Sequence, residues 1–266
     1  MDLLKKSLAP ITEGAWAEIK EQTDKFLNIY LTGRKFVDID GPNGPEMAGV
    51  STGHLKVPAK NKVGGVNFGI REFLPLIEVR KPFELDLWEL DNIDRGAEDA
   101  DVDALEQAVR DLALFEEKAI YQGFKDGMIK GLEESAENDP VKLPEDPNEF
   151  LNTVSAQVLS LKRDGVKGPY SIVLKDEKWQ QLVTLAKGYP VLKQLQDIIQ
   201  GQVIVNYINE NSYLVSEQGG DYELTLGQDI SVGYDSHTTE KVKLYLTESF
   251  TFRVHSPEAI RILSDK

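Results

Sequence analysis

The sequence predicts an α+β protein in two parts, with a long two-stranded excursion leaving the first part. Segments with helical periodicity are mixed with segments that alternate every second residue. An acidic stretch of low hydrophobicity at 133–147 separates two differently patterned regions, as a domain boundary would. The chain has 266 residues, 41% of them hydrophobic, which is enough for one large domain or two small ones with real cores.

The first expected element is an amphipathic helix between Thr12, which suits the N-cap, and Gly33, which suits the stop. Its apolar face carries Trp16, Ile19, Phe26, Leu27 and Tyr30. Residues 37–40 then alternate apolar and acidic side chains and end in a Gly/Pro turn, which predicts a strand. Residues 48–72 alternate weakly and are rich in glycine and lysine. A two-stranded ribbon of this kind is marginal alone, so we expect it to pack on something else, such as a neighbouring subunit.

A period-2 strand is expected next, running as far as Trp88. It would place two sets of side chains on opposite faces: Phe83, Leu85 and Leu87 against Glu84, Asp86 and Trp88. The acids clustered at 84–94 do not predict a glycosidase-type pair, because strand alternation followed by a helical turn points them in several directions. We expect them to cap a short helix closed by Gly96. Trp88 is expected to be an exposed ring, at an interface or as a stacking platform.

The strongest helical pattern lies between 101 and 127. Its apolar stripe consists of Leu105, Val109, Leu112, Ala113, Ala119, Ile120 and Phe124. Glu116 and Glu117 on this helix are interpreted as solvated or paired charges. After the acidic stretch the pattern changes to helix, strand, two helices and strand, so the block 136–221 is predicted to be a separate α/β domain.

The C-terminal part predicts only strands, at 221–234 and 242–254. In the second of these, one face carries Val242, Leu244, Leu246, Phe250, Phe252 and Val254. Glu248 interrupts that face. A carboxylate in this register is expected to be paired with an arginine, buried at an interface, or placed at a sheet edge against mispairing.

Motifs for catalysis are missing or lack their context. No phosphate-binding GxxxxGK[ST] or zinc-binding HExxH occurs, and the GxSxG at 49–53 has neither a buried strand before it nor a helix after it. There is no cysteine, and His54, His237 and His255 are scattered, so no metal site is expected. A carboxylate hydrolase would rest on acid clustering alone.

Composition bounds the location and the partners. No run approaches the roughly 18 apolar residues of a membrane span, and no secretory leader is recognisable at the start, so we expect a cytoplasmic protein. The net charge of −15 argues against wrapping nucleic acid, because that binding depends on Lys and Arg at phosphates.

Six strings carry a resemblance to a known family. They are LAPITEGAW, GRKFVDIDGP, LPLIEVRKPFELDLWELDNIDRG, DGVKGPYSIVL, GGDYELTLGQDISVGY and LYLTESFTF. Their order and content resemble the family 1 encapsulins, bacterial and archaeal shell proteins with the Hong Kong 97-type phage major-capsid fold. The resemblance runs from residue 8 to residue 252 and so covers nearly the whole chain.

The resemblance implies an architecture in three parts. Residues 1–47, 73–135 and 222–266 would form the peripheral domain, 48–72 the extended loop that reaches over an adjacent subunit, and 136–221 the axial domain. The tip of the axial domain would line the pore at the five-fold axis with the turn Lys187, Gly188, Tyr189 and Pro190.

The resemblance also implies a function. Subunits would assemble into an icosahedral shell that encloses a dye-decolourising peroxidase or a ferritin-like iron oxidase, bound through a short C-terminal peptide of that cargo. The implied docking groove is walled by Leu27, Leu31, Arg34, Asp38, Ile39, Ile230 and Tyr234. Arg34 and Asp38 would orient the peptide, and the apolar residues would supply burial.

Two further expectations follow from the resemblance. No cofactor is required, although flavin could stack at Trp88, because some shells of the family carry it at the matching tryptophan. The alternative function is a prophage major capsid protein that packages DNA, since the two classes of protein share the fold.

Overall fold

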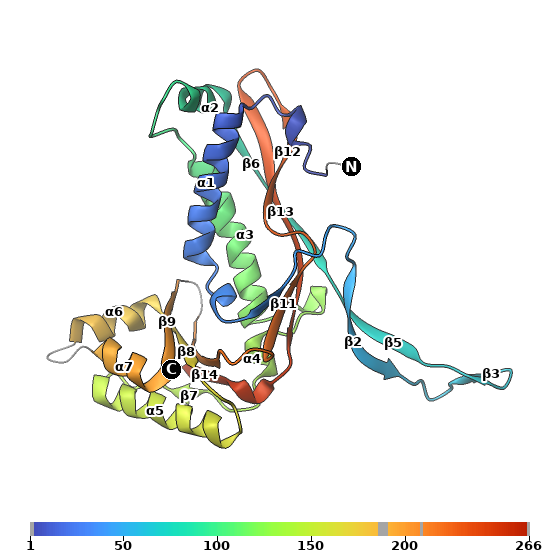
Figure 1. The fold of residues 1–266 in the computed structure, drawn as a ribbon, viewed down its shortest axis with the longest axis vertical. Coiled ribbons are helices and arrows are strands. Elements are labelled where there is room, and N and C mark those ends of the chain that lie inside the picture. The colour runs from blue at the N-terminus through green and yellow to red at the C-terminus, as the bar shows by residue number, and fades with distance from the viewer. Residues whose placement is uncertain (1–2, 186–190, 208–209, 265–266) are drawn as a thin grey trace.

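The computed structural model describes residues 3–185, 191–207 and 210–264. Two sheets lie one above the other in Figure 1, and a narrow ribbon of strands projects to the side. The predicted pore turn at 187–190 lies outside the described residues. Among the described residues, no helix combines the length and the apolar character needed to cross a membrane.

The first sheet is built around one long strand. Its members are β1 (Asp38–Asp40), β6 (Ile77–Asp86), β11 (Tyr222–Leu226), β12 (Ser231–His237) and β13 (Lys241–Val254). The N-terminal half of β13 pairs with β12 and its C-terminal half with β11, while β6 runs antiparallel along its other edge. β1 adds to β11 in parallel. The apolar face predicted for 242–254 is buried along the length of β13 apart from its last residue.

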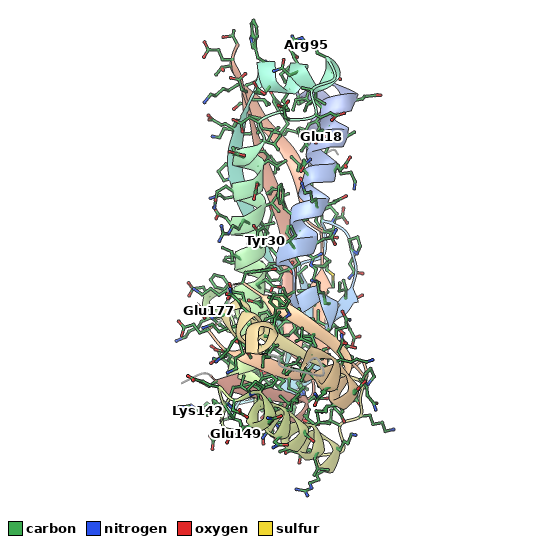
Figure 2. All side chains as sticks on the ribbon, turned by 90° about the vertical axis from the view of Figure 1, so that its left-hand side faces the viewer. Glu18, Tyr30, Arg95, Lys142, Glu149 and Glu177 are labelled. Carbon is green, nitrogen blue, oxygen red and sulfur yellow. The ribbon has the colours of Figure 1, made fainter. Side chains whose placement is uncertain are left out.

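Two long helices cover one face of this sheet. The helices α1 (Glu13–Tyr30) and α3 (Asp103–Tyr121) lie side by side, as Figure 2 shows. The Thr12 side chain accepts a hydrogen bond from the Ala15 backbone N–H at 3.2 Å, which confirms the predicted N-cap. Gly33 is not the stop: α1 ends at Tyr30, and Gly33 begins the short 3-10 turn η2 (Gly33–Lys35).

The acidic stretch after β6 forms a helix earlier than predicted. Helix α2 (Leu87–Asp94) begins directly after the strand, and Asp86 is its N-cap, accepting from the Trp88 N–H at 2.8 Å. The prediction that the strand continues through Trp88 is therefore wrong, because the Asp86 cap turns the chain into a helix. Trp88 lies in the first turn of α2 and is 71% exposed, as expected for an unpacked ring.

The segment predicted as a two-stranded excursion has that form. It consists of β2 (Gly49–Lys56), β3 (Lys62–Val63), β4 (Val66–Asn67) and β5 (Ile70–Pro75). β2 pairs with β5, and β3 pairs with β4 at the tip. In Figure 1 this ribbon extends away from both sheets. Val63, Val66 and Phe73 are exposed along it, so apolar surface is uncovered in the single chain.

The second sheet has the order β7, β14, β10, β8, β9. Its strands are β7 (Val141–Lys142), β8 (Tyr170–Lys175), β9 (Gln200–Asn206), β10 (Ser212–Ser216) and β14 (Ile260–Ser264). The helices of this region are α4 (Leu132–Ser135), α5 (Pro147–Arg163), α6 (Asp176–Leu185) and α7 (Val191–Ile199). Three further 3-10 turns are η1 (Lys6–Leu8), η3 (Lys125–Gly127) and η4 (Pro257–Ala259).

The C-terminal strand corrects the predicted division of the chain. Residues 222–266 were all expected in the peripheral domain, but β14 pairs with β10 and β7 in the second sheet. The turn η4 redirects the chain after β13, and the buried apolar side chains of 260–263 fill the second core. The other domain boundaries stay a prediction.

Candidate docking groove

A groove of about 450 Å³ lies between the second half of α1, the turn η2 and the loop before β12. Its walls are Asp24, Leu27, Asn28, Leu31, Arg34, Lys35, Asp229 and Ile230. A second hollow of about 140 Å³ shares Asp24 and Ile230 with it and continues along α1 toward Trp16. Together the two hollows follow the side of α1 that faces β12.

The groove brings together four of the seven predicted residues: Leu27, Leu31, Arg34 and Ile230. The other three do not line it. Asp38 accepts a hydrogen bond from the Gly220 N–H at 2.5 Å, and Ile39 is 46% exposed beside it. Both lie on β1, which is positioned by its parallel pairing with β11 in the first sheet. The Tyr234 hydroxyl contacts Nδ1 of His237 at 2.6 Å.

Arg34 is held by carboxylates of its own chain. Its Nε donates to both oxygens of Glu116 at 2.9 and 3.1 Å, and Nη1 donates to Asp229 at 2.9 Å. Its Nη2 donates to Glu116 at 2.5 Å and to Glu248 at 2.6 Å. Arg34 was predicted to orient the cargo peptide. In the structure its guanidinium is bound by carboxylates of its own chain, so its direct role is to hold the groove wall in place. Glu248 has the arginine partner that the sequence offered as one of its three explanations.

One guanidinium faces three carboxylates in this network, and the pKa values of Arg34 and Glu248 are both shifted. Burial would lower the pKa of Arg34, but the hydrogen bond and charge of Glu116, with Glu248 and Asp229, hold it above its usual value. Burial raises the pKa of Glu248 well above its usual range, and repulsion from Glu116 adds to this, while Arg34 opposes it. Burial and the neighbouring carboxylate therefore both favour the neutral form of Glu248.

The neighbouring residue Glu117 forms a second buried network behind the groove. Its Oε1 accepts from the Gly33 N–H at 2.8 Å, and its Oε2 contacts the Thr32 hydroxyl and accepts from Asn206 Nδ2 at 2.9 Å. The Thr32 hydroxyl also contacts the Tyr121 hydroxyl at 2.9 Å. Burial raises the pKa of Glu117 to about 8, and the hydrogen bonds from Thr32 and Gly33 oppose this.

The interpretation of Glu116 and Glu117 as solvated or paired charges is right in that Glu116 pairs with Arg34, but it did not anticipate the burial of the two carboxylates. Both residues are fully buried. A signal was present, because apolar stripe residues flank them at helical spacing: Leu112 and Ile120 lie four residues from Glu116, and Ala113 lies four residues before Glu117. Charges inside an apolar stripe are expected to face the core and to need partners there.

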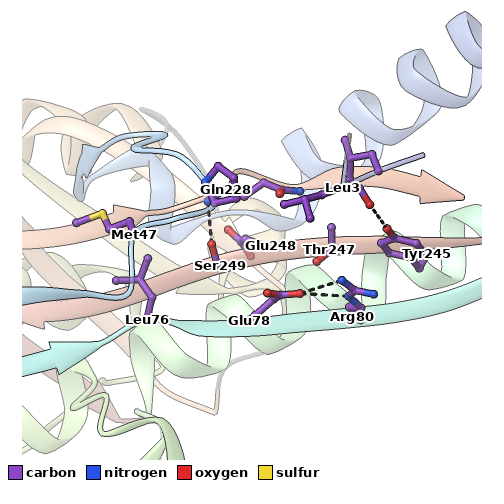
Figure 3. Close-up of a pocket in the computed structure, with 12 residues that line it drawn as sticks. Leu3, Met47, Leu76, Glu78, Arg80, Gln228, Tyr245, Thr247, Glu248 and Ser249 are labelled. Atoms are coloured by element: carbon purple, nitrogen blue, oxygen red, sulfur yellow. Dashed lines mark hydrogen bonds and ion pairs between the residues drawn. The ribbon is translucent and has the colours of Figure 1, made fainter. Parts of the chain in front are cut away.

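A separate cavity of about 160 Å³ lies under the N-terminal arm (Figure 3). The arm is tied down there, because the Tyr245 hydroxyl donates to the Leu3 carbonyl at 3.0 Å and the Tyr234 N–H to the Leu4 carbonyl at 2.8 Å. Glu248 and Gln228 line the cavity. Glu248 Oε2 and Gln228 Nε2 have no hydrogen-bond partner within the described residues. Such atoms are typical of places where ordered water completes the bonding.

The fold defines the class of protein. A virus-like particle from Pyrococcus furiosus superposes with a TM-score of 0.65 at 17% identity, covering 93% of this chain and 98% of that chain. The capsid of Myoviridae phage XM1 gives 0.53 at 12% identity, covering 89% and 92%. These likenesses confirm the predicted Hong Kong 97-type phage major-capsid fold.

The family follows from the sequence. The family described as "Encapsulating protein for peroxidase" matches residues 1–251. The "Type 1 encapsulin shell protein" of Rhodospirillum rubrum is 40% identical over 266 residues, covering 97% of this chain and 95% of its own length. The chain therefore belongs to the type 1 encapsulin family of shell proteins, as the six strings indicated.

Proposed function

We propose that copies of this chain form a closed icosahedral shell in the cytoplasm and hold a cargo enzyme inside it. The cargo would dock its C-terminal peptide in the groove beside α1. Membership of a shell-protein family supports the assembly, and the family description supports a peroxidase as cargo. A ferritin-like iron oxidase is the second candidate cargo, with roles in iron storage and oxidative stress.

The observation that carries the docking proposal is the composition of the groove. Leu27 and Ile230 offer half-buried apolar surface above the buried Leu31, and the exposed Asp24 and Lys35 add charges of both signs. An extended peptide with small apolar side chains would bury them against the first three. Such a peptide loses conformational entropy on binding, so one site binds weakly and many sites in one shell give avidity.

The test blocks the groove without touching its buried network. Asn28 is exposed on α1 and lines the groove, so Asn28→Trp is expected to fill it while leaving the shell intact. The probe is a fluorescent protein that carries the C-terminal peptide of a dye-decolourising peroxidase. Co-purification with shells should fall at least about tenfold, a loss of about 1.4 kcal/mol in binding.

The matched control is Ile29→Trp, because Ile29 is an exposed neighbour on α1 that does not line the groove. It should capture the probe as the unmodified shell does. Equal capture of the probe by Asn28→Trp and Ile29→Trp would contradict docking in this groove. Nuclease-resistant DNA inside purified shells would instead favour the prophage capsid alternative, which the net charge of −15 makes unattractive.

Flavin at Trp88 remains a separate proposal. The indole is 71% exposed, so one face is free to stack on a flat ring. Among the described residues no aromatic ring pairs with it, so a second wall would have to come from a neighbouring subunit. Flavin absorbance of purified shells should be lost in Trp88→Ala, and shells without flavin absorbance would contradict the proposal.

A further inference from the structure

Two adjacent carboxylates of α3 hold the same short segment of the groove wall from two sides. Glu116 binds the guanidinium of Arg34 through both of its oxygens. Glu117 binds the Gly33 N–H and the Thr32 hydroxyl. The segment that they hold joins α1 to η2 and connects the groove residues on α1 to Arg34 and Lys35.

The packing around this segment leaves little room for adjustment. A Cβ added to Gly33 would lie 2.9 Å from Ile120 Cδ1 and 3.2 Å from Glu117 Oε1. The segment therefore lies close against α3, and Glu117 reaches its backbone directly. Thr32, Gly33 and both glutamates are buried, so water does not compete for these hydrogen bonds.

The side chains of Glu117, Thr32 and Arg34 connect the groove to three other parts of the fold. Asn206 on β9 of the second sheet donates to Glu117 Oε2 at 2.9 Å and to the Thr32 hydroxyl at 2.6 Å. Arg34 also reaches Glu248 on β13 and Asp229 in the loop before β12. A displacement of the second sheet would act on Thr32 through these bonds, and Thr32 follows the groove residue Leu31 directly.

We propose that Glu116 and Glu117 are positioning residues for the docking groove, and that Glu117 with Asn206 couples the groove to the second sheet. This inference rests on the proposed cargo function of the groove. Burying a carboxylate costs desolvation free energy, and apolar residues of similar volume often stabilise a fold equally well. What the carboxylates add is a defined position for the backbone of Thr32 and Gly33 and for the guanidinium of Arg34.

The charged and titratable groups around Glu117 are few. Glu116 and Tyr121 face it from its own helix. Thr32, Gly33 and Asn206 meet it from η2 and β9 as uncharged partners. Arg34 pairs with Glu116, and Glu248 and Asp229 pair with Arg34. Glu117→Gln keeps an acceptor for the Gly33 N–H and so serves as the conservative variant.

The experiment compares Glu117→Ala, Glu117→Gln and Glu133→Gln in assembled shells. Glu133 is the control because it also accepts two side-chain hydrogen bonds, from Asn211 and Tyr213, and does not line the groove. Hydrogen exchange is followed by mass spectrometry in the peptide that contains Gly33. Capture of the fluorescent probe and shell size by light scattering are measured on the same samples.

The expected result separates positioning from general stability. Glu117→Ala should speed exchange at Gly33 about tenfold, which corresponds to about 1.4 kcal/mol, and should weaken probe capture roughly fivefold or more, as coupled sites do. Shell size should not change, and Glu117→Gln should restore most of both losses. If Glu117→Ala forms no shells, the near-isosteric Thr32→Val takes its place and should speed exchange at Gly33 in the same way.

Exchange and capture that change no more than in Glu133→Gln would overturn the inference. The exchange measurement needs no cargo, so the two proposals can fail separately. Unmodified shells that capture no probe would contradict the docking function, while faster exchange at Gly33 in Glu117→Ala would still support the positioning role.

Discussion

At the scale of single residues, the buried glutamates have the largest consequences. Glu116, Glu117 and Glu248 are each at most 1% exposed, and Arg34 is the one cation that Glu116 and Glu248 share in the described structure. Replacing Arg34 by an acid would leave its carboxylate partners without a cation, and the loss of a buried partner typically costs about 3 to 5 kcal/mol. A loss of cargo capture in an Arg34→Glu variant could therefore result from unfolding, so it would not by itself test peptide binding.

The protonation of Glu117 gives a pH prediction. Its pKa is raised from 4.5 to about 8 in the folded chain, so its contribution to stability is complete below about pH 4.5 and is lost as the pH rises through about 8. The unmodified chain should therefore lose about 2 to 3 kcal/mol relative to Glu117→Gln between about pH 6 and pH 9. Thermal unfolding of both proteins across this range measures the difference.

A constant difference between the two proteins would contradict the prediction. The raised pKa of Glu248 acts in the same direction, since burial is its main cause too. Because Glu248 is present in both proteins, its contribution cancels in the comparison to the extent that the two networks are independent.

At the scale of elements, periodicity predicted the type of most helices and strands but not their partners. The apolar stripes of α1 and α3 were recognisable because each repeats with helical spacing over a long stretch. The strand β14 was not predicted, because its 5 residues are too few to show a clear periodicity, and its pairing with β10 was missed for the same reason. The end of β6 was missed because Asp86 reads both as a polar strand residue and as a helix cap.

The groove shows the same limit for side chains. Leu27, Leu31 and Arg34 were predicted together, and they lie together because they follow one another on α1 and η2. Asp38 and Ile39 are close to them in sequence but belong to β1, whose direction is determined by its parallel pairing with β11. Glu117 was missed because its partners lie 84 to 89 positions away in the sequence.

The ribbon gives a prediction at the scale of elements. Val63 and Val66 at its tip are 70% and 69% exposed, and burial against another subunit would stabilise both side chains. Val66→Asp should leave the chain folded but prevent or shrink the assembly, because an unpaired charge would be buried at the contact. Light scattering measures particle size, and circular dichroism checks the fold.

The matched control for the ribbon is Asn67→Asp, which places the same charge one residue further along β4, on the opposite face of the strand. It should assemble as the unmodified chain does. Full-sized shells from Val66→Asp would show that the tip of the ribbon is not buried in the assembly.

At the scale of the whole molecule, the two sheets are not separate modules in sequence. The chain passes between them at three places in the described structure: from β6 to β7, from β10 to β11, and from β13 to β14. The strand β14 is an interior member of the second sheet, between β7 and β10. A fragment limited to 136–221 would lack this strand and expose the edge of β10.

The three chain crossings between the sheets affect how rigid the subunit is. Two domains joined by one linker can rotate about it as a hinge, but three covalent connections between the two sheets resist both rotation and separation. Load applied to one part of a subunit would then be shared among several chain segments. In the wall of an assembled shell, such a subunit is expected to move as one rigid unit, without a hinge between its two sheets.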